Sequence, residues 1–174
     1  MAAHWQDIHL AGVAVLLFQG DGFSGAQPKP TNVNISAKTE YACIAVLELA
    51  LNYGSGDPVT IRAIAETHGI PSRFLVQILL QLKGAGIVGS TRGAAGGYQL
   101  VRDPQQLTLV EVMRVIDGDS RELTKNTETT TPVSAALFDV WQEVAAAEQN
   151  MLQLHSFGDL VEQVRGQTEK MYYI

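Results

Sequence analysis

The sequence is poor in cysteine, in long apolar runs and in positive charge. Cys43 is the single cysteine among 174 residues, which excludes an internal disulfide framework and a metal site built from several cysteines. This usage suits a reducing cytoplasm, and we expect the protein to act there. The apolar run from Leu10 to Phe18 covers nine residues, whereas a membrane-spanning helix needs about 20. No lysine or arginine precedes it, as a secretory signal would require. We therefore expect no membrane association.

Residues 1–34 differ in character from the rest of the chain. The stretch after Phe18 is rich in glycine, proline and asparagine, which is typical of a loose linker. We expect an extension that is disordered, or one that results from a start codon assigned too far upstream. Val33 is a candidate start, because GUG can initiate translation and the folded pattern begins two residues later.

A helix-turn-helix pattern lies between Ile61 and Leu79. Apolar residues recur there at helical spacing on both sides of Gly69, which can adopt the positive φ of a tight turn. With Thr60 as the cap of the first helix, the pattern predicts helices over 61–67 and 72–83. The outer face of the second helix would be free to enter a DNA major groove.

The flanking segments predict a wing and two more helices. Short β-like runs at 87–91 and 98–102 enclose a glycine-rich tip that begins at Arg92. After them, a capping box at Thr108 opens a helix that ends at Asp117-Gly118. A helix that Ser36 can cap, running to about Tyr53, precedes the motif. Its expected apolar face consists of Tyr41, Ile44, Leu47 and Leu51, widened by Val46 and Ala50.

From Thr131-Pro132 onward the sequence predicts a helix of about 23 residues, roughly 35 Å long. Its apolar residues are spaced alternately four and three apart over three heptads, which is the pattern of a coiled-coil seam. A small domain does not need so long a helix to cover itself, so we expect a homodimer. A final short helix is predicted over 160–164. The predicted dimerisation residues are Val133, Leu137, Val140, Val144, Ala147, Met151 and Leu154.

The expected DNA contacts lie on the second helix of the motif and on the wing. Arg73 can bond guanine through two hydrogen bonds or contact a phosphate, and Gln77 can pair with adenine. Phe74 either packs under its helix or touches a thymine methyl. Arg92 either enters a minor groove or is an exposed turn arginine. The full predicted set is Lys38, Thr60, Ser72, Arg73, Phe74, Val76, Gln77, Arg92, Gly93 and Tyr98, with phosphate contacts expected from Lys38 and Thr60.

The charge distribution agrees with this assignment. The net charge of −6 by itself disfavours a nucleic-acid binder. Residues 35–102, however, contain six basic and four acidic side chains, a balance of +2, whereas residues 103–174 have a balance of −7. Because the positive excess is small, we expect only a few phosphate contacts per subunit.

No set of residues indicates an enzyme. The four histidines are scattered without metal-ligand spacing, and no Ser-His-Asp set or carboxylate pair stands out. The wing glycines are not followed by the Lys-Ser/Thr of a P-loop. Cys43 is expected to be buried and inert, the alternative being a redox thiol with exposure and a lowered pKa.

These motifs together resemble the Rrf2 family of winged-helix regulators over residues 35–161. The matching strings are ISAKTEYACIAVLELA (35–50), IAETHGIPSRFLVQILLQLKGAGIV (64–88), STRGAAGGYQL (90–100) and LTLVEVMRVIDG (107–118). The wing string, S-x-R-G-x-x-G-G-Y-x-L, is the most specific of them. The resemblance implies a homodimeric bacterial transcription factor, usually a repressor, whose recognition helices enter the major grooves of a palindromic operator.

Two departures from the family matter. Cluster-binding members carry three cysteines in the loop after the I-D-G helix, whereas residues 119–131 contain neither cysteine nor histidine. Because thiolates are the usual cluster ligands, we predict no iron–sulfur cluster and no other cofactor, as in the cluster-free branch. Many relatives have glutamate where this chain has Val76, which can make only apolar contacts, for instance with a thymine methyl. The operator preference is therefore expected to differ.

The sequence as a whole predicts a mainly α fold with a small β wing. We expect an extension (1–34), a winged helix-turn-helix domain (35–104), a connecting helix with a sensing-type loop lacking cysteine (105–131), and a dimerisation helix with a C-terminal segment (132–174). The predicted function is that of a sequence-specific DNA-binding repressor, controlled by an effector or partner protein that the sequence does not identify. The alternative, suggested by the acidic second half, is a protein-interaction module with weak or lost DNA binding.

Overall fold

The computed structural model describes residues 35–93, 95–118 and 131–171, which lie in the second of two units into which the chain divides, Asn34–Ile174. The predictions for residues 1–34 and for residues 119–130 of the sensing-type loop therefore fall outside the described residues. No helix in the described part of the chain is long and apolar enough to cross a membrane.

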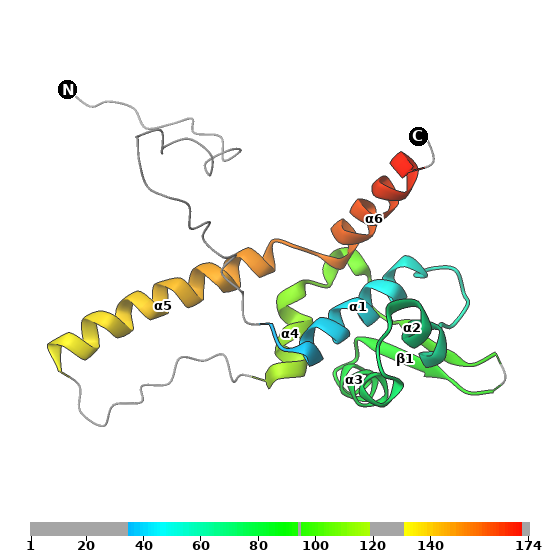
Figure 1. The fold of residues 1–174 in the computed structure, drawn as a ribbon, viewed down its shortest axis with the longest axis horizontal. Coiled ribbons are helices and arrows are strands. Elements are labelled where there is room, and N and C mark those ends of the chain that lie inside the picture. The colour runs from blue at the N-terminus through cyan, green and yellow to red at the C-terminus, as the bar shows by residue number, and fades with distance from the viewer. Residues whose placement is uncertain (1–34, 94, 119–130, 172–174) are drawn as a thin grey trace, which may run out of the picture. The chain divides into compact units, whose positions relative to one another are not determined.

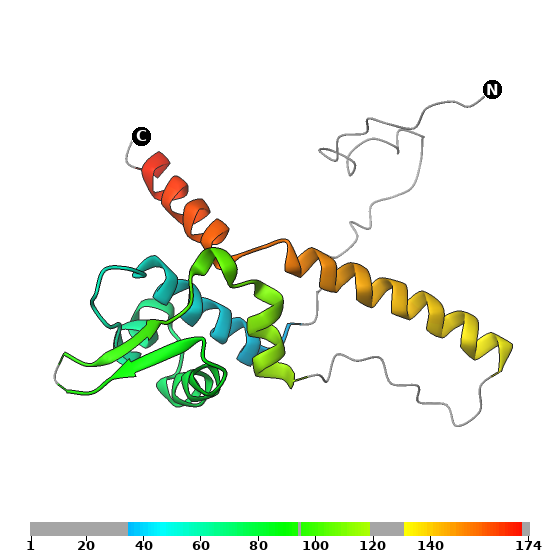
Figure 2. The same ribbon diagram turned by 180° about the vertical axis from the view of Figure 1, so that it is seen from behind.

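The described residues form a mainly helical fold with one small antiparallel sheet, as the sequence predicts (Figure 1, Figure 2). The strands pair in a register that runs from Val88–Leu100 to Thr91–Gly97. The elements, in chain order, are α1 (Ala37–Leu51), α2 (Ile61–His68), α3 (Ser72–Gly84), β1 (Val88–Thr91), β2 (Gly97–Leu100), the 3₁₀ turn η1 (Pro104–Gln106), α4 (Leu109–Asp117), α5 (Pro132–Gln153) and α6 (Phe157–Met171).

Helix α1 lies at the centre of this arrangement. Ser36 caps it, as predicted, by accepting the Thr39 N–H at 3.1 Å. In Figure 1 the helix runs between α4 on one side and α2 and α3 on the other, and it also contacts α6 and β2. Its fully buried apolar side chains are small or of medium size: Ala42, Ala45, Val46 and Leu49.

The predicted apolar face of α1 was therefore partly wrong. Tyr41, Ile44 and Leu47 are half-buried at the edge of the core, while Ala42 and Ala45 face its centre. Alanines contribute little to a hydrophobicity pattern, but they allow neighbouring helices to approach closely. The periodicity identified the helix and misplaced the side on which its neighbours pack.

A buried polar contact joins the start of α1 to the end of α4. Thr39 is fully buried, and its hydroxyl donates to Asp117 Oδ1 at 2.6 Å. Burying a hydroxyl is favourable only when it has a hydrogen-bond partner, which Asp117 supplies. This contact fixes the end of α4 against the first turn of α1.

Hydrogen bonds hold the starts of the last two helices in place. Helix α5 starts at Thr131-Pro132 as predicted, and Thr131 caps it by accepting the Ser134 N–H at 3.1 Å. Helix α6 begins at Phe157, which is fully buried and whose N–H donates to the Leu107 carbonyl at 2.8 Å. The prediction of a short final helix was wrong, because α6 continues to Met171. Leu160 and Val161 pack in or against the core, whereas the added length after residue 164 is mainly polar, and no apolar pattern in the sequence marks it.

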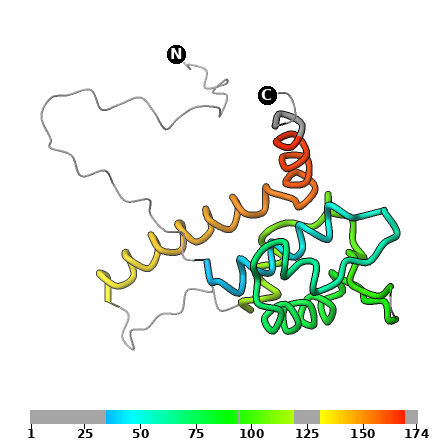
Figure 3. Tube along the Cα trace, turned by 45° about the vertical axis from the view of Figure 1, so that its right-hand side comes forward, coloured from blue at the N-terminus to red at the C-terminus, as the bar shows by residue number. Residues whose placement is uncertain are grey.

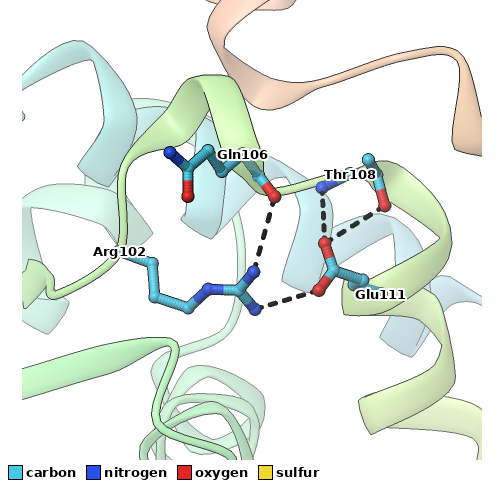
Figure 4. Close-up of polar contacts among 4 residues, drawn as sticks. All are labelled: Arg102, Gln106, Thr108 and Glu111. Carbon is cyan, nitrogen blue, oxygen red and sulfur yellow. Dashed lines mark hydrogen bonds and ion pairs between the residues drawn. The ribbon is translucent and has the colours of Figure 1, made fainter.

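An ion pair ties the end of the hairpin to the start of α4 (Figure 4). The Glu111 carboxylate accepts the Thr108 N–H at 3.0 Å, completing the predicted capping box, and pairs with Arg102 Nη1 at 3.0 Å. A second nitrogen of Arg102 donates to the Gln106 carbonyl at 3.4 Å. Burial alone would raise the pKa of Glu111, but the Thr108 N–H and the Arg102 guanidinium outweigh it and hold the pKa below its ordinary value.

Replacing Glu111 with glutamine should lower the free energy of unfolding at neutral pH by about 1 kcal/mol, because the ion pair and the charge-assisted cap are lost. The wild-type carboxylate stabilises the fold above its ordinary pKa of 4.5, and this contribution is lost as the pH falls through the lower pKa of the folded state. Urea denaturation near neutral pH and at about pH 3.5 tests this expectation.

The difference in the free energy of unfolding between wild type and Glu111→Gln should become smaller as the pH is lowered. Arg102→Met, which removes one partner and leaves the Thr108 cap, should give a smaller change in the same direction. A difference that grows at low pH would contradict the assignment.

Candidate nucleic-acid interface

The helix-turn-helix is present as the sequence predicts. Thr60 caps α2 by accepting the Ala63 N–H at 3.1 Å, and Gly69 adopts the left-handed conformation at φ 65°. Leu75 and Ile78 of α3 are fully buried. One side of α3 is therefore fixed in the core, and the opposite side is left exposed. Figure 3 follows the backbone through the described elements as a tube.

The outward face of α3 consists of five exposed side chains. Ser72 lies exposed at the start, and Val76, Gln77 and Leu80 follow Arg73 by three, four and seven residues, which places these four on one side of the helix. Leu80, 57% exposed, was missed by the sequence analysis, although the same periodicity would have found it. The outward face of α3 is Ser72, Arg73, Val76, Gln77 and Leu80.

Arg73 packs on an aromatic pair formed by Phe74 and Tyr41. The guanidinium carbon of Arg73 lies 5.0 Å from the centroid of the Phe74 ring, and that ring lies 6.0 Å from the ring of Tyr41 on α1. A cation–π contact at such an exposed site contributes about 0.5–1 kcal/mol. This placement favours the packing alternative for Phe74 and links the position of Arg73 to α1.

The wing is a hairpin with Arg92 and Gly93 exposed at its tip. In β2, the N–H and carbonyl of Tyr98 pair with the backbone of Val59 at 2.8 and 2.9 Å. A Cβ on Gly97 would lie 2.6 Å from the Val59 carbonyl oxygen, so this close approach requires glycine. Tyr98 itself is half-buried against the core, which leaves only part of its ring for DNA.

Most charged side chains on α2, α3 and the hairpin are positive. Lys83 Nζ donates to Ser90 Oγ at 2.6 Å, which holds the ammonium between α3 and β1. Arg62 on α2 is paired with Glu66 at 2.7 Å. Arg73 and Arg92 form no ion pair with another described residue. Lys83 was not among the predicted DNA contacts, because its place beside the hairpin depends on the tertiary fold.

Two predicted phosphate contacts have partners within the chain. Lys38 Nζ donates to the carbonyl of Ile116 at 3.4 Å, where a cation complements the carbonyl end of α4. Thr60 uses its hydroxyl oxygen as the cap of α2. Their contacts with phosphate stay predictions.

The predicted dimerisation residues lie on an uncovered side of α5. No residue of this helix is buried, and the half-buried Phe138, Ala145 and Leu152 lie on another side. The large apolar members of the seam are each at least 52% exposed: Val133, Leu137, Val140, Val144, Met151 and Leu154. Ala147 between them is exposed as well.

The donor set of the chain does not fit a thiolate-held iron centre. Iron–sulfur clusters are held by several cysteine thiolates, and the chain has one cysteine. Cys43 is half-buried rather than buried, because the centre of the core faces Ala42 and Ala45 instead. Within the described ranges, no three histidine, cysteine or acidic side chains are grouped so that they could hold a metal ion.

Known proteins resemble this chain in both sequence and fold. A family model described as Rrf2, iron-dependent transcriptional regulator, matches residues 35–163. The HTH-type transcriptional regulator CymR of Bacillus subtilis is 31% identical over 143 residues, which cover 82% of this chain and 100% of that protein.

Two solved structures extend the likeness to three dimensions. The structure of CymR, called the global cysteine regulator of B. subtilis, matches with a TM-score of 0.67 at 30% identity and covers 75% of this chain and 98% of that one. The structure of T. potens IscR matches with a TM-score of 0.63 at 28% identity, and the match covers 76% of this chain and 89% of that one.

The family match covers the helix-turn-helix, the wing, α4, α5 and the first half of α6. The outward face of α3 and the hairpin beside it are the arrangement expected of that group. The chain belongs to the Rrf2 family of transcriptional regulators.

Proposed function

We propose that this chain is a homodimeric, sequence-specific DNA-binding repressor that acts in the cytoplasm without an iron–sulfur cluster. The observation that carries the proposal is the outward face of α3, whose exposed side chains stand beside a hairpin with an arginine at its tip. In such proteins the second helix of the motif reads base edges in the major groove. Arg73 and Gln77 then bond guanine and adenine, and Arg92 enters the neighbouring minor groove.

The exposed seam of α5 supports a dimer. Exposing apolar side chains at coiled-coil spacing to water is unfavourable, and a second copy of the helix that covers them removes this cost. A two-fold dimer presents two copies of α3, which matches a palindromic operator. Bound at an operator that overlaps a promoter, it blocks access of the polymerase, and it acts in this way as a repressor.

Replacing either arginine should weaken DNA binding in a different way. Arg73→Ala should lower affinity for a selected site by roughly 5- to 150-fold, because a bidentate base contact is worth about 1–3 kcal/mol. Arg92→Ala should weaken binding to all sequences and reduce the slope of log affinity against log salt by about one. Fluorescence anisotropy across a salt series measures both effects.

Arg165→Ala is the matched control, because it removes an equal charge from an exposed position on α6. It should leave affinity and salt slope unchanged. If the full chain bound no DNA fragment even at low salt, the repressor proposal would fail. The protein-interaction alternative would then be favoured.

Introducing a charge into the seam should separate the dimer. Val144→Glu places a carboxylate against its counterpart in the partner, so the mass in solution should fall from twice 18.8 kDa to 18.8 kDa. Gln142→Glu adds the same charge to α5 outside the seam and should remain dimeric. Light scattering after size-exclusion chromatography distinguishes the outcomes, and a dimeric Val144→Glu would show that the interface lies elsewhere.

Anaerobic reconstitution with iron and sulfide should leave the protein without visible absorbance, because one cysteine cannot replace the thiolate set of a cluster. Cys43→Ser should behave identically in this assay. A stable brown protein with bound iron would refute the cluster-free proposal.

A further inference from the structure

Two aliphatic side chains stand on the outward face of α3 among polar ones. Val76 is 42% exposed and Leu80 is 57% exposed. They are four residues apart, so they are neighbours on one side of the helix, about one turn from each other. We call Val76 and Leu80 the apolar pair of α3.

The core of the chain does not use this pair. At about 100° per residue, Leu80 points roughly 150° away from the mean direction of the fully buried residues of α3. A single exposed aliphatic side chain is common on protein surfaces, but two neighbouring ones on the helix face beside the wing form a small apolar surface that a bound partner can cover. The fully buried residues on the other side are Leu75, Ile78, Leu79 and Leu82.

The charges around the pair favour DNA over a protein as that partner. Helix α3 contains Arg73 and Lys83 and no acidic residue, and the nearby hairpin adds Arg92. An apolar centre inside a positive rim is complementary to a major groove, where phosphates flank the base edges. The thymine 5-methyl is the apolar group that a base pair presents in that groove.

The spacing of the outward face fits several successive base pairs. Arg73, Val76, Gln77 and Leu80 follow the intervals of three, four and seven residues that a homeodomain uses on its groove-reading helix. At 1.5 Å per residue, Leu80 lies roughly 10 Å beyond Arg73 along the axis. This length corresponds to about three base-pair steps of 3.4 Å.

From this placement we infer that the apolar pair of α3 reads thymine 5-methyl groups in the operator, and that Leu80 is a specificity-determining residue. The inference rests on the proposed function and deepens it by naming the group on the DNA. Leu80 contacts a thymine about three base pairs from the base read by Arg73. Val76 contacts a second methyl one helical turn nearer to the start of α3.

The test changes the DNA rather than the protein. A site is first selected from random DNA with the full chain. Each thymine is then replaced singly by deoxyuridine, which keeps every hydrogen-bonding group of the base pair and removes only the methyl. Replacement at a contacted position should weaken binding about fourfold, the effect of one buried methyl, and the other positions should not respond.

Protein variants assign each methyl to a side chain. Leu80→Ala should bind the thymine and deoxyuridine sites equally at one position, and Val76→Ala should do so at another. Val101→Ala is the matched control, because Val101 is an aliphatic residue outside α3 that is 58% exposed. It should retain full discrimination at both positions.

The outcomes separate this inference from the proposed function. Specific, salt-dependent binding without any thymine-to-deoxyuridine effect, or a selected site with no thymine at these positions, would overturn the inference alone. A Leu80→Ala protein that discriminates normally, or that changes its oligomeric state, would overturn it too. Failure of the full chain to select any DNA would overturn the proposed function and this inference together.

Discussion

The close packing of α1 against its neighbours is the constraint on which the described fold depends. Ala42 and Ala45 are fully buried on this helix, and α3, α4, α6 and β2 all contact it. Small side chains at helix contacts permit short distances between helix axes. Because the interior is densely packed, a larger side chain there would displace the neighbouring helices. The same helix carries Tyr41, which supports Phe74 and through it Arg73. The packing of α1 therefore determines the position of a predicted DNA contact as well as the stability of the core.

Polar contacts hold helix α4 to its neighbours at both of its ends. Glu111 in its first turn pairs with Arg102, which follows the hairpin, and Asp117 at its last residue accepts the buried Thr39 hydroxyl of α1. Lys38 adds a contact to the carbonyl of Ile116. Helix α4 also contacts α5, so a displacement of α5 would press on a helix whose two ends are fixed by polar contacts. Since α4 contacts α3 as well, it lies between the proposed dimer helix α5 and the helix whose outward face is predicted to read DNA.

Much of this arrangement could be predicted from local signals in the sequence. Ser36, Thr60 and Thr131 cap helices where the sequence placed them, because capping depends on a few adjacent residues. The buried side of α1 was misassigned because alanines that face the core resemble alanines on a surface. The contact of Lys38 with α4 spans 78 residues, and no local pattern contains such a distance. The seam and most of the outward face of α3 could be predicted from periodicity, whereas Leu80 was not predicted, because its residue type does not distinguish it from the buried Leu79 beside it.

A net charge of −6 is compatible with DNA binding because electrostatic fields in salt are local. At physiological ionic strength the Debye length is about 8 Å, so charges on distant elements contribute little at the groove. Helix α5 carries three acidic residues and no basic one, while α3 carries two basic residues and no acidic one. DNA is therefore attracted in one orientation and repelled in others. With few phosphate contacts, nonspecific affinity stays low, and contacts with bases make up a larger share of the binding free energy. In a repressor of the proposed kind, an apolar contact with a thymine methyl then adds to specificity without strengthening attraction to every other sequence.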